Sequence, residues 1–107
     1  MTNNFQYDLI VTIVNKGFSE KIIQSSRKAG AHGGTIIHGR GTGIHEDAKI
    51  FGISIEPEKE VILTLIKKDL TEVVLEAIMA AGELKKPGKG IAFVLDISKV
   101  AGISHIT

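Results

Sequence analysis

Apolar residues along the chain fall into short runs with strand character and two longer stretches with helical spacing. Residues 8–14 are nearly all apolar and rich in β-branched side chains, which predicts a strand that is covered on at least one face. Residues 61–66 give the clearest strand pattern in the sequence, and 35–38 and 90–97 predict two further strands. Residues 50–55 are also expected to be extended.

Two stretches have the three- to four-residue spacing of amphipathic helices. We expect the first to be capped by Ser19 and to end near Gly30. The second spans 70–81, with Asp69 as its expected cap and Gly82 near its end. The apolar positions of the first helix are Ile22, Ile23, Ser26 and Ala29. Those of the second are Leu70, Val73, Val74, Ala77, Ile78 and Ala81.

The segments between these elements are polar or rich in glycine and proline. Residues 39–43 carry a glycine at every second position, and the polar residues 44–49 that follow predict an exposed loop. Pro57 cannot donate to a strand ladder, so 56–60 is expected to be a bulge or a turn. The tail 100–106 has the composition of a short edge strand.

The predicted order is strand, helix, strand, strand, helix, strand. This order defines the ferredoxin-like fold of the α+β class, a four-stranded antiparallel sheet with both helices on one face. We therefore expect a single domain over 1–107. The helices leave the second sheet face uncovered, and the first strand is apolar at almost every position. We expect the chain to form oligomers through that face.

Composition excludes several classes of function. The chain of 107 residues is 43% hydrophobic and 23% charged, as in ordinary globular domains. It has no cysteine, which rules out disulfides, thiolate catalysis and zinc–thiolate sites. The net charge is +1 and basic residues are spread along the chain, so neither a nucleic-acid surface nor attraction to a membrane is indicated. No apolar stretch approaches the roughly 20 residues needed to span a bilayer, so we expect no membrane insertion. No secretory leader is visible, and we expect a cytoplasmic protein.

Two glycine-rich segments are the candidates for ligand binding. The first, 39–43, lies between a strand and a loop, a context that argues against a dinucleotide-binding fingerprint. The second, 85–90, places three lysines around a Pro-Gly turn and lacks a phosphate-binding P-loop motif, because Gly90 follows Lys89. Such segments let backbone N–H groups approach an anion. Both patterns also occur in loops that bind no ligand, so this alternative stays open.

The four histidines, at 32, 38, 45 and 105, match neither the spacing of a helical ligand pair nor a zinc signature. Only His45 has neighbouring carboxylates, on Glu46 and Asp47. We expect no dedicated metal site and no cofactor.

The sequence also offers no catalytic constellation. Its serines lack the setting of a nucleophile elbow and its carboxylates are scattered. An acylphosphatase, a small enzyme on the same fold, needs an arginine beside an asparagine that orients water. Neither Arg27 nor Arg40 has such an asparagine nearby in the sequence. We expect a binding protein and no enzyme.

The glycine segments and the order of elements together resemble the nitrogen regulatory protein P-II family, over about residues 8–104. Residues 40–43, Arg-Gly-Thr-Gly, are similar to the family's Lys-Gly-aromatic-Gly at the root of its signalling loop. Residues 88–96 are similar to its Gly-Asp-Gly-Lys-Ile-Phe-Val-Phe-Asp stretch. The resemblance implies a homotrimer that binds ATP or ADP in clefts between subunits. It also implies that a protruding loop regulates a transporter or a metabolic enzyme.

The resemblance assigns roles to particular residues. Ile13 and Leu65 are expected to line an adenine pocket, and Thr35 is expected to contact the nucleotide from the second strand. The remaining residues that the resemblance places at the phosphates are Gly41, Gly43, Gly88, Lys89 and Gly90. We add Arg40 and Lys86 to the candidate site as nearby cations.

The chain departs from the family pattern at the phosphates. Lys89 replaces an aspartate, and Ile91 replaces a phosphate-binding Lys or Arg. Gly102 and Ser104 stand where the family has two arginines. Each charge-assisted hydrogen bond is typically worth about 1.5–3 kcal/mol, and their loss weakens contacts to the terminal phosphate most. We therefore expect ADP or AMP to be favoured over ATP, with lysines 85, 86 and 89 and Arg40 compensating in part.

The signalling loop, about 43–52, is shorter than the family's and contains no tyrosine that could be uridylylated. Ile44 and His45 replace the residues that position Mg-ATP and 2-oxoglutarate, so a magnesium requirement stays open. We expect a sensor of adenylates. The alternative is a P-II-like module that binds bicarbonate, a cyclic nucleotide or a metal ion.

Overall fold

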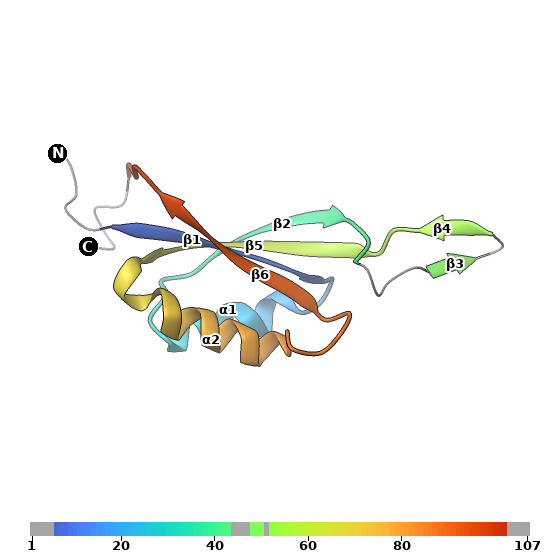
Figure 1. Ribbon diagram of the computed structural model, residues 1–107, viewed down its shortest axis with the longest axis horizontal. Coiled ribbons are helices and arrows are strands. Elements are labelled where there is room, and N and C mark those ends of the chain that lie inside the picture. The colour runs from blue at the N-terminus through green and yellow to red at the C-terminus, as the bar shows by residue number, and fades with distance from the viewer. Residues whose placement is uncertain (1–5, 44–47, 51, 103–107) are drawn as a thin grey trace.

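The computed structural model describes residues 6–43, 48–50 and 52–102 of the chain. Four strands form an antiparallel sheet in the order β2-β5-β1-β6, and α1 and α2 pack together on one of its faces (Figure 1). This confirms the predicted ferredoxin-like fold. The elements are β1 (Tyr7–Asn15), α1 (Ser19–Lys28), β2 (Thr35–Arg40), β3 (Ala48–Ile50), β4 (Ile53–Ile55), β5 (Glu58–Lys67), the 3-10 helix η1 (Lys68–Leu70), α2 (Thr71–Gly82) and β6 (Gly90–Ile97).

Alternation along the strands divides the sheet into an inner face on the helices and an outer face. Ile10 pairs with Thr64 and Val94, and its side chain is fully buried against the helices. The inner core consists of Ile10, Val14, Ile22, Ala31, Ile62, Ile66, Val74 and Ile78. All eight are aliphatic, as expected for a chain without tryptophan.

The outer sheet face is also apolar, and none of the helices in the described part of the chain covers it (Figure 1). Val11 pairs there with Leu63 and Phe93, and Leu9 pairs with Leu65 and Leu95. Phe93 is 41% exposed and Leu95 is 47% exposed in the single chain. The predicted uncovered face is therefore present.

The start of α1 differs from the prediction. Ser19 is buried and is the first helical residue, so the N-cap position belongs to Phe18, whose side chain makes no capping hydrogen bond. The cap comes from β5, where Glu60 Oε1 accepts hydrogen bonds from Gly17 N at 2.8 Å and Ser19 N at 3.2 Å. Burial alone would raise the pKa of the Glu60 carboxyl, but these hydrogen bonds outweigh it, and the pKa lies below its ordinary value.

The start of α2 also differs, because Asp69 belongs to η1 and caps no helix through its side chain. The first helical residue is Thr71, whose hydroxyl donates to Asp8 Oδ2 at 2.8 Å. The ammonium of Lys68 binds both Asp8 and Asp96, which ties this end of α2 to β1 and β6. The hydrogen bond from Lys68 is the main cause that lowers the pKa of Asp8.

The helical face of α2 is rotated slightly from the predicted one. Val73 was expected in the core but is 49% exposed, whereas Leu75 packs against the core instead. The sequence pattern allowed both faces, and contact with the sheet selected one of them. The helix ends at Gly82, and Glu83 follows in the left-handed conformation with a φ of 53°.

The loop segments hold further differences. β2 extends through Arg40, so part of the first glycine segment is strand, and β5 already begins at Glu58 where a turn was expected. Ala48 and Lys49, expected in a loop, belong to β3, which pairs with β4 in a hairpin that projects from the sheet (Figure 1).

Some predictions concern residues beyond the described ones. Of the expected signalling loop at 43–52, residues 44–47 and 51 lie outside the described residues, and so do Ile44 and His45. Residues 100–102 form no strand, and the rest of the predicted tail strand, with Ser104 and His105, also lies outside the described residues. Within the described part of the chain, no helix is both long and apolar enough to cross a membrane.

Candidate functional site

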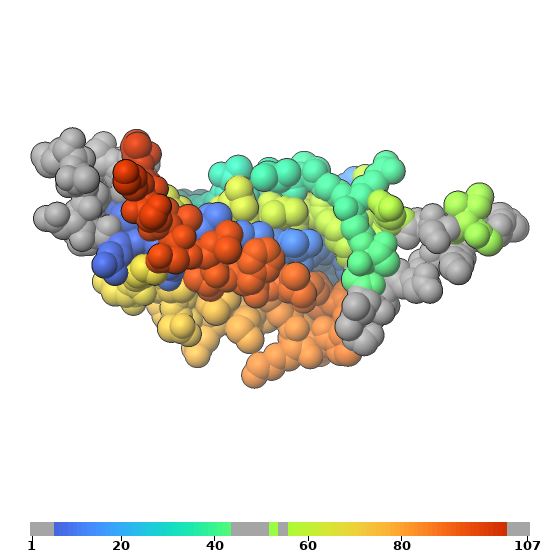
Figure 2. Space-filling view, turned by 45° about the horizontal axis from the view of Figure 1, so that its top comes forward, coloured from blue at the N-terminus to red at the C-terminus, as the bar shows by residue number. Residues whose placement is uncertain are grey.

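The two glycine segments meet at a cavity of about 580 Å³. In the space-filling view, the end of β2 descends beside the loop that leads into β6 (Figure 2). Strand register explains this meeting, because Gly39 pairs with Lys59, and Ile13 pairs with both Val61 and Ile91. The lining residues are Ile13, Gly39, Arg40, Gly41, Thr42, Gly43, Lys59, Val61, Leu84, Lys85, Lys86, Pro87, Gly88, Gly90 and Ile91.

The first glycine segment enters the cavity as the end of strand β2. A Cβ atom built on Gly39 or Gly41 would meet no atom within 4 Å. Gly41 N donates to the Pro57 carbonyl at 3.2 Å, which holds the segment beside the start of β5. The packing of this chain therefore does not require glycine at 39 or 41, and the open space lets a ligand approach the backbone.

The second glycine segment is fixed by backbone geometry. Gly88 has a φ of 77° and Gly90 a φ of 144°, values that side chains disfavour. A Cβ atom on Gly90 would lie 2.4 Å from the Ile13 carbonyl oxygen. Gly90 is therefore required for the close approach of β6 to β1, whether or not a ligand binds.

The charged side chains that line the cavity, among the described residues, are all basic: Arg40, Lys59, Lys85 and Lys86. Lys59 is the buried member, 9% exposed, and its Nζ donates to Asn15 Oδ1 at 2.7 Å. Lys86 Nζ pairs with Glu83 Oε1 at 3.2 Å on the exposed side of the turn. This hydrogen bond lowers the pKa of the Glu83 carboxyl. A lining of this kind suits an anionic ligand.

Apolar side chains form the other part of the cavity wall. Ile13, Val61 and Ile91 belong to the outer sheet face, and Leu84 lines the cavity from the loop after α2. Ile91 is 57% exposed in the single chain. An apolar wall beside a basic one suits a ligand with a flat apolar part and an anionic part.

The cavity brings together seven of the ten predicted site residues: Ile13, Arg40, Gly41, Gly43, Lys86, Gly88 and Gly90. Thr35 and Leu65 lie on the same sheet face but further along it, where Thr35 pairs with Leu63 and Leu65 pairs with Leu9. Lys89 lies elsewhere, with its ammonium 3.6 Å from Glu83 Oε2 and 5.6 Å from the centre of the Phe18 ring.

Sequence analysis missed Lys59 as a site residue. We expected 56–60 to form a bulge or turn because Pro57 within it cannot donate to a strand ladder, whereas the ladder of β5 already includes Glu58. Strand alternation continued backwards from Val61 would have placed Lys59 on the same face as Val61 and Ile13.

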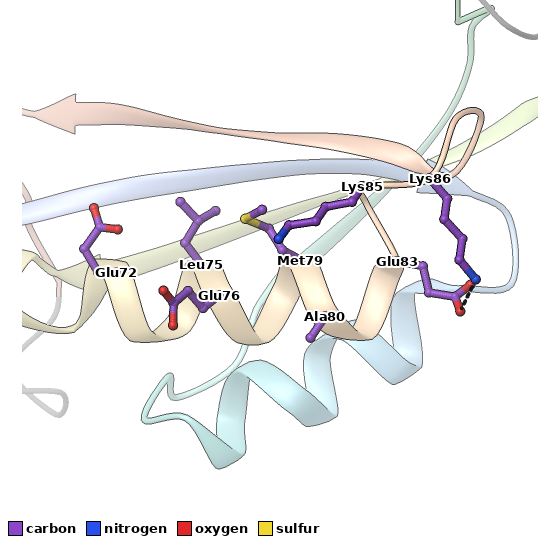
Figure 3. A pocket seen from close by; sticks show the side chains of 8 residues that line it. All are labelled: Glu72, Leu75, Glu76, Met79, Ala80, Glu83, Lys85 and Lys86. Atoms are coloured by element: carbon purple, nitrogen blue, oxygen red, sulfur yellow. Dashed lines mark hydrogen bonds and ion pairs between the residues drawn. The ribbon is translucent and has the colours of Figure 1, made fainter.

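A second cavity, of about 560 Å³, runs along α2 and contains none of the predicted site residues except Lys86. Its apolar part is formed by Leu75 and Met79, whose side chains point toward the strands in the close view (Figure 3). Glu72 and Glu76 add carboxylates to its wall. These carboxylates make it a poorer site for an anion than the cavity at the glycine segments.

The described residues hold no cluster of three His, Asp or Glu side chains that could bind a metal ion. Among the described residues, His38 Nδ1 lies 3.8 Å from Glu60 Oε2. Glu60 is already bound to the start of α1.

Comparison with known proteins assigns this chain to a family. The crystal structure of Arabidopsis thaliana PII bound to citrate matches with a TM-score of 0.74 and 23% sequence identity, over 96% of this chain and 88% of that chain. Comparison with curated proteins finds no match. The family model of nitrogen regulatory protein P-II matches residues 7–105. Since that match spans nearly the whole chain, the protein belongs to the nitrogen regulatory protein P-II family of regulatory signalling proteins.

Proposed function

We propose that this protein binds an adenine nucleotide in the cavity between its two glycine segments and thereby regulates a transporter or a metabolic enzyme. The observation that carries the proposal is the cavity wall itself, with four basic and no acidic side chains among the described residues, next to an apolar surface. Phosphates suit the basic part and backbone N–H groups, and a purine suits the apolar part.

In this arrangement the base packs on Ile13 and Ile91, at the edge of the outer sheet face. The phosphates lie between Arg40 on β2 and the lysines of the loop after α2. Gly41 and Gly88 offer backbone without a side chain on either side of them.

The same cavity favours ADP or AMP over ATP. Ile91 contributes no charge at the start of β6, and Gly102 contributes none near the C-terminal end. Lys89 is held by Glu83 and Phe18, so it does not replace those cations at the cavity. Fewer charge-assisted contacts remain for a third phosphate.

The outer sheet face supports a homotrimer, the assembly of the P-II family. Its exposed apolar residues include Ile37 at 47% and Phe93 at 41% exposure, a surface suited to burial against a second copy. Thr35 and Leu65 lie on that face, outside the cavity of their own chain. In the trimer they line the cleft of a neighbouring subunit and so complete its nucleotide site.

The protein acts as a cytoplasmic regulator and not as an enzyme. Its output is the segment at about 43–52, which follows the cavity residues of β2 directly in the chain. A ligand that binds Arg40 and Gly41 therefore changes the conformation of the residues from which this segment starts.

Calorimetric titration with ATP, ADP and AMP, with and without magnesium and 2-oxoglutarate, tests the proposal. We expect micromolar binding of ADP or AMP that is indifferent to 2-oxoglutarate. Lys86→Gln is expected to weaken it about tenfold, as for one lost charge-assisted contact, while Lys28→Gln at the exposed end of α1 leaves it unchanged. Wild-type protein that binds no adenine nucleotide refutes the proposal.

The basic lining also favours a second candidate, a small anion such as bicarbonate, in the same cavity. The matching PII structure was solved with citrate, itself a polyanion without a base. A cyclic nucleotide and a metal ion are the other ligands of this alternative. Stabilisation by bicarbonate that ADP does not displace favours the small anion, and loss of stability with a chelator favours the metal ion.

A further inference from the structure

Asn15 connects the buried lysine of the cavity to the second glycine segment. It is the last residue of β1 and pairs with Lys59 across the ladder. Its Oδ1 accepts a hydrogen bond from Lys59 Nζ at 2.7 Å, and its Nδ2 donates to the Gly88 carbonyl at 3.3 Å. Asn15 itself does not line the cavity, whereas Lys59 and Gly88 both do.

The two partners fix the orientation of the amide. A lysine ammonium only donates hydrogen bonds and a carbonyl oxygen only accepts them. A side chain between them must therefore accept on one side and donate on the other, as the amide of Asn15 does. An aspartate would keep the contact to Lys59 but would turn an acceptor toward the Gly88 carbonyl, and a lysine would repel Lys59.

Among the described residues, the other contacts made by polar groups of the turn that Gly88 belongs to stay within the turn or lead to Glu83 and Phe18. Lys89 N donates to the Lys86 carbonyl at 3.4 Å within the turn. Lys86 and Lys89 pair with Glu83, which lies at the exposed end of α2. The bond from Asn15 joins the turn to the sheet. It therefore sets the position of the turn relative to Lys59.

We propose that Asn15 is a positioning residue that holds Lys59 and the 86–89 turn in one arrangement for a phosphate group in the cavity. The ligand class rests on the proposed function. Lys59 is the buried lysine of the cavity lining, and Gly88 lines the same cavity from the turn. Because Asn15 holds both Lys59 and Gly88 in place, these residues lose less conformational entropy when a phosphate binds between them.

A double-mutant cycle tests the proposal with ADP and with inorganic pyrophosphate, which carries phosphates without a base. We expect Asn15→Ala to weaken binding about tenfold and Lys59→Met to weaken it more. In the Lys59→Met background, Asn15→Ala is expected to cost much less, since the lysine that it positions is gone. A merely structural role of Asn15 gives equal losses in both backgrounds and overturns the proposal.

Asn15→Asp provides a second, nearly isosteric variant in case Asn15→Ala folds poorly. Its carboxylate keeps Lys59 but cannot donate to Gly88. We expect faster amide exchange at residues 88–90 in the free protein, and a larger affinity loss for pyrophosphate than for AMP. The control is Lys16→Gln, because Lys16 pairs with Glu58 at 3.2 Å on the exposed surface and lines no part of the cavity.

The outcomes separate this inference from the proposed function. Binding of pyrophosphate but of no adenine nucleotide refutes the adenylate proposal, while loss of pyrophosphate affinity in Asn15→Ala still supports the role of Asn15. Nucleotide binding that is unchanged in Asn15→Ala and Asn15→Asp overturns the inference alone. A wild-type protein that binds neither ligand refutes both.

Discussion

The two glycine segments look alike in sequence, yet the fold uses them differently. At Gly39 and Gly41 a side-chain carbon would meet no atom within 4 Å. At Gly90 the same carbon would lie 2.4 Å from a backbone oxygen of β1. Strand packing therefore requires glycine in the second segment, whereas the first segment has space beside its backbone for another molecule.

This difference shows that a glycine pattern has two separate physical causes. A positive φ or a close strand approach requires glycine for folding, as at Gly88 and Gly90. Where neither applies, as at Gly39 and Gly41, the folding of the single chain does not require the absence of a side chain. The first segment is therefore the better place to test for a ligand, although the second has more lysines.

Gly90→Ala should have the largest effect. The new methyl group collides with the Ile13 carbonyl, and the φ of 144° is strained for alanine. We expect a loss of roughly 3 kcal/mol in the free energy of unfolding, measured by urea denaturation. A loss under about 0.5 kcal/mol would fall in the range of ordinary surface substitutions. It would contradict the conclusion that strand packing requires glycine at position 90.

Glu60→Gln should have the second largest effect on stability. Together with Glu83→Gln, it compares the carboxylates next to the two glycine segments. Glu60 pairs with His38 beside the first segment and binds the start of α1, whereas the exposed Glu83 pairs with lysines of the second. We expect Glu60→Gln to cost about 1–3 kcal/mol, since buried N–H groups lose a charged acceptor. Glu83→Gln, the matched control, should cost less because solvent screens its ion pairs. Equal costs would contradict this ranking.

The same pair predicts a pH dependence. The folded-state pKa of Glu60 is lowered, so its contribution is fully present above the unfolded pKa of about 4.3 and is lost as the pH falls through the folded value. We expect wild-type stability to decline from about pH 5 downward, and this decline to be shallower in Glu60→Gln. Urea titrations at several pH values measure both slopes, and identical slopes would rule out the contribution.

Gly88→Ala should have an intermediate effect. Its φ of 77° lies in the left-handed region, but a Cβ atom there would meet nothing within 4 Å. Only the conformational cost remains, about 1 kcal/mol. Thermal denaturation of Gly88→Ala and Gly90→Ala under the same conditions checks which variant loses more stability. A greater loss in Gly88→Ala would contradict our conclusion that Gly90 is the more closely packed position.

Gly41→Ala should have the smallest effect on folding and a distinct effect on binding. With open space and no positive φ, the substitution leaves stability within about 0.5 kcal/mol of wild type or raises it slightly. Nucleotide affinity should fall at least tenfold because the methyl group blocks the backbone. Unfolding measures the first effect and calorimetry the second. Unchanged affinity would remove Gly41 from the site.

Local patterns in the sequence were sufficient for the four main strands, both helices and the ferredoxin-like order. The strand at 90–97 was predicted with the bounds that the structure has. The helix caps were not predictable in the same way. Ser19 and Asp69 have the residue types of caps, but Glu60 and Asp8 bind the helix starts from strands that are distant in sequence.

The site was predictable only in part. Seven candidate residues line one cavity, because the ends of β1 and β2 and the start of β6 meet at one end of the sheet. The direction of a lysine side chain was not predictable. Lys89 lies within the second segment yet pairs with Glu83, while Lys59 enters the cavity from a strand that was mistaken for a turn.

The sequence by itself determined the class of fold, the apolar outer sheet face and the two backbone segments that can approach an anion, since periodicity and glycine positions are local properties. Only the tertiary structure decided which cations face the cavity, which glycines the packing requires, and that Asn15 links Lys59 to Gly88. These features depend on contacts between residues as far apart as 15 and 88, and such contacts exist only once strand register has brought both sides together.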